Sequence, residues 1–248
     1  MTPEEGLARL AALGLGGDDA RVLWAHFDDA ERRGKEGHGH ARIPWLESQP
    51  FDPAARAARL AAADGLERWD GSGALGYLTL AAICDALVAD PPAGARVVVA
   101  SACFPTGVLG YWGRRLAEEA GLVAVLTATS PRRLPHPDGG EPLTGTNPIA
   151  IAVPSSDGRA FVADVSMGAV THGDVLAGRA RPDELVPFGG PQAYKAFALA
   201  AGLELLVGAL AGAEHGAVRV VAQPDHDAVP AFRELAAGVR LPGESRPR

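Results

Sequence analysis

The chain of 248 residues has few cysteines and methionines, no block of basic residues and no long uninterrupted apolar run. Its two cysteines, Cys84 and Cys103, provide no disulfide framework and fit a reducing cytoplasm. The net charge of −7, without a basic block, argues against nucleic acid as a partner. The most apolar stretch, residues 196–213, is broken by Glu204 and three glycines, so no membrane span is expected. We therefore expect a soluble, cytoplasmic, globular protein.

Short motifs that bind phosphates or metals are also missing. The segment 101–110 follows a predicted strand but lacks the G-x-G-x-x-G spacing that brings backbone amides against a pyrophosphate. The chain contains no P-loop, and it offers neither C-x-x-C nor H-E-x-x-H as metal ligands. We therefore expect no metal site and no Rossmann-type nucleotide site. Without further information, these residues indicate only an α/β protein.

The pattern of apolar residues and turn residues predicts helices that alternate with strands. With 47% hydrophobic and 21% charged residues, a chain of this length can bury one large core or two modest ones. A strand, a glycine-rich turn, a helix and a second strand between residues 96 and 127 predict a βαβ unit with parallel pairing. Residues 131–142 are rich in proline and glycine and predict a loop. Helices are expected at 20–33, 53–64, 78–89, 109–120 and 193–210, and strands at 96–100, 122–127, 148–153, 160–164 and 219–222.

The most informative stretch is residues 145–154, in which Asn147 and Pro148 precede an uninterrupted apolar strand. A turn at residues 155–158 then leads into a second short strand that ends in Asp164. The two strands predict a hairpin that places one carboxylate at the end of a buried strand.

Eight blocks resemble, in the same order, the motifs of the malate/L-lactate dehydrogenase family of nicotinamide-dependent 2-oxoacid and cyclic-imine reductases. This family is unrelated to the Rossmann-type lactate dehydrogenases. Residues 33–44 resemble its R-G-H-x-S-H-G-x-x-R block, and residues 194–197 resemble its Y-K-G-[YF] block. The other matching blocks are residues 70–76, 107–112, 137–140, the G-T-N-P segment 145–148, Asp164 and residues 241–244. Each block is short, but their common order is hard to obtain by chance.

The resemblance implies a three-layer α/β fold with a mixed sheet, similar to that of L-sulfolactate dehydrogenase. It divides the chain into a helical N-terminal part at 1–70, an α/β core with the nucleotide region at 71–222, and a C-terminal segment at 223–248 that returns to the N-terminal part. It also implies a homodimer with the site near the subunit interface. The alanine-rich helices and residues 196–210 supply apolar surface for such an interface.

The same resemblance implies hydride transfer between NAD(P)H and a small carboxylate-bearing substrate, at C2 of a 2-oxoacid or at the C=N bond of a cyclic imino acid. It places His38 as the proton donor, Asp164 as its partner and Arg42 on the substrate carboxylate. These residue types fit, because an imidazole titrates near neutrality and a guanidinium binds a carboxylate through two hydrogen bonds. Lys195 is expected beside a cofactor phosphate or the substrate carboxylate. The expected contacts of NAD or NADP are Thr146, Asn147, Val165, Ser166 and Lys195.

Two departures from the family pattern leave the activity open. Gly37 stands where the first block has its serine, and Pro105 stands where another block has a second catalytic histidine, so neither can transfer a proton. His136 or His172 can substitute only if the fold brings one of them there. One function class is therefore a compact reductase that uses His38. The other is a non-redox enzyme on the same scaffold, for instance one that acts on an imine or 2-oxoacid by proton transfer, or a pseudoenzyme that binds a partner. A separate alternative is that His38 is a surface-loop histidine and Arg42 an ordinary ion-pair partner.

Overall fold

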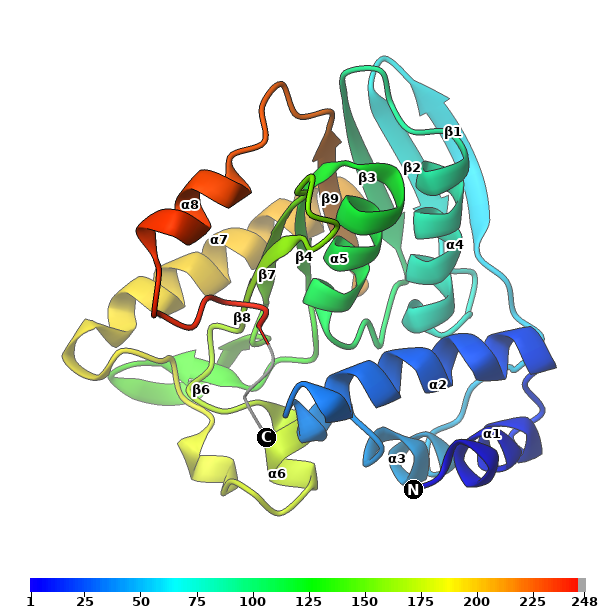
Figure 1. Cartoon of the computed structure of the whole chain (residues 1–248). Coiled ribbons are helices and arrows are strands. Elements are labelled where there is room, and N and C mark those ends of the chain that lie inside the picture. Colours follow the sequence, from blue (N-terminus) through cyan, green and yellow to red (C-terminus); the bar gives the residue numbers. More distant parts are fainter. Residues whose placement is uncertain (245–248) are drawn as a thin grey trace.

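A seven-stranded mixed sheet lies at the centre of the molecule (Figure 1). The computed structural model describes residues 1–244. The strand order is β1-β2-β3-β9-β4-β7-β8; β2 and β3 pair in parallel, and the other neighbours pair antiparallel. The strands are β1 (Ala58–Ala63), β2 (Leu66–Asp70), β3 (Ala95–Ser101), β4 (Val123–Ala128), β7 (Ile149–Val153), β8 (Phe161–Val165) and β9 (Ala217–Ala222). A separate two-stranded sheet contains β5 (Leu134–His136) and β6 (Gly139–Thr144).

Helices cover both faces of this sheet, which gives the predicted three-layer α/β architecture. In Figure 1, α4 and α5 lie on one face, and α7 packs across β3, β9 and β4 on the other. α2 lies against α4 and α5, and α1 packs on α2 and α3. The helices are α1 (Pro3–Ala12), α2 (Gly17–Arg32), α3 (Arg42–Glu47), α4 (Gly76–Ala89), α5 (Leu109–Ala120), α6 (His172–Leu176), α7 (Ala193–Ala211) and α8 (Val229–Leu235). Short 3₁₀ turns are η1 (Glu36–His38), η2 (Pro182–Glu184) and η3 (Gly190–Gln192).

One continuous hydrophobic core joins the N-terminal helices to the sheet. Trp112 and Leu116 of α5 are fully buried, and they belong to the same core cluster as Leu126 of β4. Phe27 of α2 and Ile43 of α3 are part of this cluster as well. Packing of this kind leaves little room for relative motion. The core therefore fixes η1 and α3 beside the strand ends that carry the other candidate residues.

Residues 53–64 do not form the alanine-rich helix that was expected. Ala58–Ala63 is instead β1, an exposed edge strand paired with β2. The turn between the two strands is Asp64-Gly65, and both residues have positive φ angles of 51° and 77°, as a tight hairpin requires. The helix prediction was wrong because strand pairing outweighs the helix propensity of alanine, an advantage of less than about 1 kcal/mol per residue over most other residues.

The βαβ prediction is right in its elements and wrong in its pairing. β3, α5 and β4 follow one another as expected, but β9 lies between the two strands and is antiparallel to both. A strand contributed by a distant segment leaves no trace in a local pattern. Residues 131–142, expected to be a loop, contain most of the β5–β6 hairpin. The remaining predicted helices and strands are present, with ends shifted by at most three residues.

The long helix α7 is apolar and only partly buried. Three of its side chains pack toward the sheet, whereas several leucines are exposed, among them Leu205 at 73%. Gly190–Ala211 has the length and composition of a helix that could cross a membrane, and 22% of an apolar 18-residue stretch within it is buried in the fold. The expectation that Glu204 excludes such a reading is therefore not met. Glu204 itself has a partner within the fold, since Asn147 Nδ2 donates a hydrogen bond to its carboxylate at 2.6 Å.

The C-terminal segment reaches back to the N-terminal helices. Arg33, which follows α2, donates a hydrogen bond from Nη1 to the carbonyl oxygen of Gly243 at 2.8 Å. Residues 245–248 of the predicted 223–248 segment lie outside the described residues. The division into three parts stays a prediction.

Candidate active site

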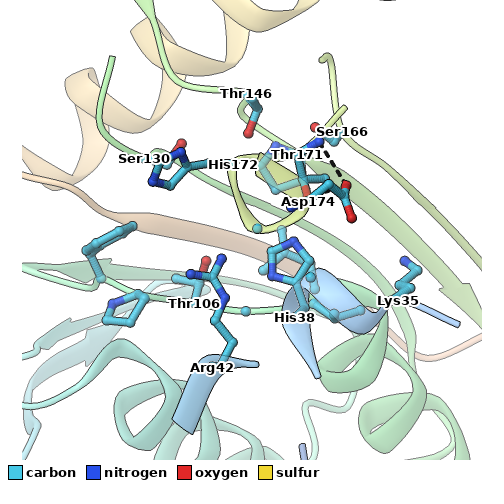
Figure 2. A pocket seen from close by; sticks show the side chains of 18 of the residues that line it. Lys35, His38, Arg42, Thr106, Ser130, Thr146, Ser166, Thr171, His172 and Asp174 are labelled. Atoms are coloured by element: carbon cyan, nitrogen blue, oxygen red, sulfur yellow. Dashed lines mark hydrogen bonds between the residues drawn. The ribbon is translucent and has the colours of Figure 1, made fainter. Parts of the chain in front are cut away.

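A cavity of about 500 Å³ opens where the carboxyl ends of β3, β4 and β8 meet the N-terminal helices. These carboxyl ends lie at the same end of the sheet because the three strands run in the same direction. Ligand sites of α/β folds commonly lie at such an end. In Figure 2, His38 and Arg42 lie below the cavity, and Ser130 and Thr146 lie above it.

His38, the predicted proton donor, ends η1 and lines the cavity. Its Nδ1 atom is buried and has no hydrogen-bond partner within residues 1–244. Burial, and after it the charge of Arg42, holds the pKa of His38 well below its ordinary value. The imidazole is therefore neutral at pH 7 in the free protein. It can gain a proton readily only when a negative charge enters the cavity.

Asp164, the predicted partner of His38, lies near the end of β8 and is bonded to other groups. The Nζ ammonium of Lys35 lies 2.8 Å from Asp164 Oδ2, and the backbone N–H of Gly110 donates to the same oxygen at 3.0 Å. A Cβ atom at position 110 would lie 3.0 Å from this carboxylate, so glycine gives it room. No hydrogen bond joins His38 to Asp164 in the part of the chain that the structure describes. Both residues nevertheless line the same cavity, together with Lys35.

Arg42, the predicted ligand of the substrate carboxylate, begins α3 and lines the cavity. Its guanidinium lies over the ring of Trp45, 4.9 Å from the centroid. Arg42 is only 9% exposed, and its Nε atom is buried without a hydrogen-bond partner among the described residues. A cation in such a place destabilises the fold unless something supplies a negative charge. The arrangement therefore favours an anionic ligand.

Two further basic groups line the same cavity. Arg133 follows β4, is half-buried, and has its pKa lowered by burial and then by Arg42. His172 begins α6, and its pKa is lowered to about 4 by burial, followed by Arg133 and Arg42. His172 is therefore neutral at pH 7, while both guanidiniums keep their charge. Arg42, Arg133 and His172 thus line one cavity.

Both departures from the family pattern are found at this cavity. Gly37 of η1 and Gly173 of α6 approach so closely that a Cβ on Gly37 would lie 2.7 Å from the backbone of Gly173. A serine at position 37 would fit only if α6 moved away. Glycine at this position therefore allows α6 to pack directly against η1 at the cavity. Pro105 lines the cavity, and so does His172, one of the two suggested substitutes. The other, His136, does not.

Three residues expected to bind the cofactor lie outside the cavity. Asn147 is fully buried, and its side chain bonds to α7 through Glu204, so it connects the start of β7 to that helix. Val165 is 44% exposed at the end of β8. Lys195 is exposed on the first turn of α7, and its ammonium lies 5.9 Å from the centroid of the ring that precedes it. The expectation that Lys195 shares the pocket with His38 is not met, because no residue of α7 lines the described cavity.

The cavity also contains residues that sequence reasoning missed. Lys35 lies inside the block that carries His38, but its role became visible only when the fold placed Asp164 against it. Arg133 lies in a predicted loop where no motif marks it. Thr146 and Ser166, of which a cofactor contact was expected, do line the cavity.

Comparison with known proteins points to one family. A family model described as malate/L-lactate dehydrogenase matches residues 6–184. The (2R)-3-sulfolactate dehydrogenase (NADP(+)) of Chromohalobacter salexigens is 32% identical over 187 residues, which cover 74% of this chain and 56% of that protein. The Delta(1)-pyrroline-2-carboxylate/Delta(1)-piperideine-2-carboxylate reductase of Pseudomonas putida is 32% identical over 228 residues, which cover 78% of this chain and 64% of that protein. The chain thus matches less than two thirds of the length of either relative.

The fold is shared with solved structures over nearly the whole chain. A dehydrogenase from Sinorhizobium meliloti superposes with a TM-score of 0.79 at 26% identity, covering 98% of this chain and 83% of that one. A delta1-piperideine-2-carboxylate reductase from Pseudomonas syringae gives a TM-score of 0.81 at 24% identity, covering 96% and 88%. The likeness therefore extends to the strands and helices that build the cavity.

Proposed function

Because the chain belongs to the malate/L-lactate dehydrogenase family, we propose that it is an NAD(P)-dependent oxidoreductase. The reaction is hydride transfer between NAD(P)H and a small carboxylate-bearing substrate, at C2 of a 2-oxoacid or at the C=N bond of a cyclic imino acid. Both substrate types occur in the names of the relatives given above, whose length this chain covers only in part.

The observation that carries this proposal is that His38, Arg42 and Asp164 line one cavity although they come from η1, α3 and β8. Reduction of a carbonyl or imine needs a cation for the substrate carboxylate and a proton source beside the reacting atom. Arg42 supplies the first and His38 the second. Neither packing nor secondary structure alone accounts for an unpaired imidazole and an unpaired guanidinium in the same buried space.

The polar lining and the volume of the cavity are compatible with a nicotinamide nucleotide. The hydroxyl groups of Thr146 and Ser166 line it beside the candidate acid, and its volume of about 500 Å³ lies in the range of small-molecule sites. These two residues hold the nucleotide in this proposal, and the nicotinamide supplies the hydride when bound. Asn147, Val165 and Lys195 do not line this cavity, and their contact with the cofactor stays a prediction.

Substrate binding prepares His38 for its role. His38 is neutral in the free protein partly because Arg42 is nearby. A carboxylate that pairs with Arg42 cancels this charge, so the substrate raises the pKa of His38 and favours the protonated form that donates. Lys35 meanwhile holds the Asp164 carboxylate in place.

A second candidate is a non-redox enzyme or a pseudoenzyme on this scaffold, which Gly37 and Pro105 favour because neither can transfer a proton. A fluorescence titration with NADH and with NADPH separates the two candidates. We expect saturable binding of at least one nucleotide, and loss of its fluorescence when 2-oxoacids or cyclic imino acids are added. A Ser166→Ala variant should bind the same nucleotide more weakly. Failure of both nucleotides to bind would leave the non-redox function as the better account.

We also propose a homodimer in the cytoplasm, held by the exposed face of α7. Leu199 and Leu206, seven residues apart on one face, are 54% and 45% exposed, and apolar side chains that gather on an exposed face commonly mark an interface. Cys84 and Cys103 are buried free thiols, which suits a reducing compartment. Light scattering should give twice the chain mass of 25.5 kDa, and Leu206→Glu should give the monomer. A monomer mass for the unchanged protein at micromolar concentration would contradict the dimer.

A further inference from the structure

The strand that carries Asp164 has only one neighbour among the described strands of the sheet. β8 pairs with β7 and ends the strand order, so its outer edge has no partner strand in residues 1–244. The Asp164 carboxylate accepts hydrogen bonds from Lys35 Nζ and from the backbone N–H of Gly110. An edge strand leaves a row of its backbone groups unpaired and is held from one side only. The position of Asp164 in the cavity therefore depends on what packs against β8 from outside the sheet.

A short turn at residues 241–244 packs against this strand. Its sequence, Leu-Pro-Gly-Glu, suits a type II turn, and Gly243 has the positive φ of 83° that the third position of such a turn requires. The backbone N–H of Glu244 donates to the carbonyl oxygen of Leu241 at 3.3 Å, and the Glu244 carboxylate accepts from the backbone N–H of Leu241 at 2.9 Å. The turn is therefore a closed unit held by its own hydrogen bonds.

Gly243 lies so close to β8 that no side chain fits between them. A Cβ atom at position 243 would lie 2.7 Å from the carbonyl oxygen of Val162. Val162 lies two residues before Asp164 and points to the same face of the strand. Both side chains reach Gly110, since a Cβ atom there would lie 3.1 Å from Val162 and 3.0 Å from the Asp164 carboxylate. The turn therefore contacts the part of β8 that holds the candidate carboxylate in place.

The same turn is bonded to the segment that carries Lys35. Arg33, two residues before Lys35, donates a hydrogen bond from Nη1 to the carbonyl oxygen of Gly243 at 2.8 Å. Its guanidinium is fixed, because Nε donates to both carboxylate oxygens of Asp29, at 2.9 and 3.0 Å, and Arg114 of α5 pairs with the same carboxylate at 3.1 Å. In Figure 1 the red C-terminal segment passes beside β8 toward the end of α2. One turn thus contacts both segments that meet in the ion pair at the cavity.

We propose that the 241–244 turn positions Asp164 in the cavity, acting through Arg33 on one side and Val162 on the other. The turn sets the separation between β8 and the segment that ends in His38, and so keeps the carboxylate and the candidate proton donor at one cavity. Neither the turn nor Arg33 touches the substrate, so both act on catalysis through positioning. This inference rests on the proposed function and gives a task to the P-G-E block.

Two glycines of the same segment provide a matched pair of variants. Gly243→Ala and Gly238→Ala both add a Cβ atom at a positive φ, 83° and 84°, but the Cβ at position 238 meets nothing within 4 Å. Backbone strain is therefore common to both variants, and only Gly243→Ala forces the turn away from β8. With pyruvate and the cyclic imine derived from proline as probes, we expect Gly243→Ala to lower kcat by at least about tenfold and to leave nucleotide affinity unchanged. Gly238→Ala should change neither.

Hydrogen exchange of the Gly110 amide, followed by NMR, reports on the turn without turnover. Gly110 is the second residue of α5, so no carbonyl oxygen within the helix accepts its N–H, and Asp164 is its acceptor. Displacement of Asp164 exposes this amide to water. We expect its exchange to become at least about tenfold faster in Gly243→Ala and to stay unchanged in Gly238→Ala.

Arg33→Met releases the turn from its other side. This variant removes the hydrogen bond to Gly243 and adds no atom beside β8. It should speed the exchange of the Gly110 amide and lower kcat, whereas Arg32→Met, at the exposed neighbouring position, should change neither. Arg33→Met decides the question if Gly243→Ala does not fold.

A double variant tests whether the turn acts through the ion pair. When Lys35→Met has already released Asp164, adding Gly243→Ala should lower kcat much less than it does in the unchanged protein. Equal exchange of the Gly110 amide in the two glycine variants would overturn the proposal, and so would a loss that falls on nucleotide affinity or one that persists in full beside Lys35→Met. If neither probe is turned over, the proposed function fails by itself. The exchange of the Gly110 amide then still decides whether the turn positions Asp164.

Discussion

On one side of the cavity the Lys35 ammonium lies 2.8 Å from the Asp164 carboxylate, whereas on the other Arg42 and Arg133 have no carboxylate partner within residues 1–244. In Figure 2, Lys35 and Arg42 lie to either side of His38. An ion pair completed by the fold holds its members in place whether or not a ligand is present. The unpaired guanidiniums have no such partner, and burial, followed by the charge of Arg42, holds the pKa of His38 well below its ordinary value. The fold thus places a completed ion pair and two guanidiniums without a carboxylate partner, among the described residues, around the cavity that His38 lines.

The largest effect on activity is expected from removing the guanidinium of Arg42, one of the two that have no carboxylate partner among the described residues. Arg42→Met removes the cation but keeps a long apolar stem beside Trp45. Because loss of a buried charge-assisted contact costs about 2–5 kcal/mol, kcat/KM should fall by about 10²-fold or more. The protein should not lose stability, since a buried unpaired charge disappears. Steady-state kinetics and thermal unfolding check both statements, with Arg132→Gln, at an exposed position outside the cavity, as the control. A loss below about threefold would mean that Arg42 does not bind the substrate carboxylate.

The imidazole between the two sides should have the next largest effect. His38→Ala should lower kcat by at least about 10²-fold, the contribution of general acid catalysis, and leave nucleotide affinity intact. The exposed His226, outside the cavity, gives the matched control His226→Ala. Kinetics and nucleotide titration of both variants are the measurements. Turnover that survives His38→Ala would assign the proton to another group.

Breaking the paired side should change stability more than binding. Lys35→Met leaves Asp164, only 11% exposed, without its cation. Because Lys35 is 40% exposed and the pair is partly screened by water, we expect a loss of about 1 kcal/mol in the free energy of unfolding. A double-mutant cycle with Asp164→Asn, measured by urea unfolding, should give a coupling energy of similar size. A coupling near zero would show that the two groups do not interact in solution.

The smallest effect should be the pH dependence of the free energy of unfolding that comes from His172, which lines the cavity together with the two unpaired guanidiniums. The pKa of His172 is lowered to about 4, below the value of about 6.5 for an unfolded chain. Below pH 6.5 the unfolded state therefore binds more protons, and the free energy of unfolding falls as the pH drops toward 4. The fall is less than about 1.4 kcal/mol per pH unit, because His172 is half-exposed. His172→Asn should flatten the curve obtained from urea unfolding at several pH values. An unchanged slope would contradict the assignment.

Local patterns were enough for most helices and for the residue types of the site. α5 was predicted to the residue, because its apolar periodicity and the glycine that follows it are local signals. The β7–β8 hairpin was predicted with Asp164 near its end for the same reason, since a short turn joins the two strands. His38 and Arg42 lie four residues apart in the block 33–44, so the sequence alone was enough to predict that they line the same side of one cavity. Residue identity and short spacing suffice where every partner lies within a few positions.

Only the tertiary structure decided which strands are neighbours and which charges are paired. β9 separates β3 from β4, and Lys35 meets Asp164 across 129 positions. Arg133 faces the cavity although nothing in its own segment marks it, whereas Lys195 stays outside although its block matches the family. Ion pairs and hydrogen bonds act over a few ångströms, and those distances depend on how distant segments pack together. The amino-acid sequence by itself therefore determined the kind of chemistry that this cavity can carry, and the packing decided which side chains are left free to perform it.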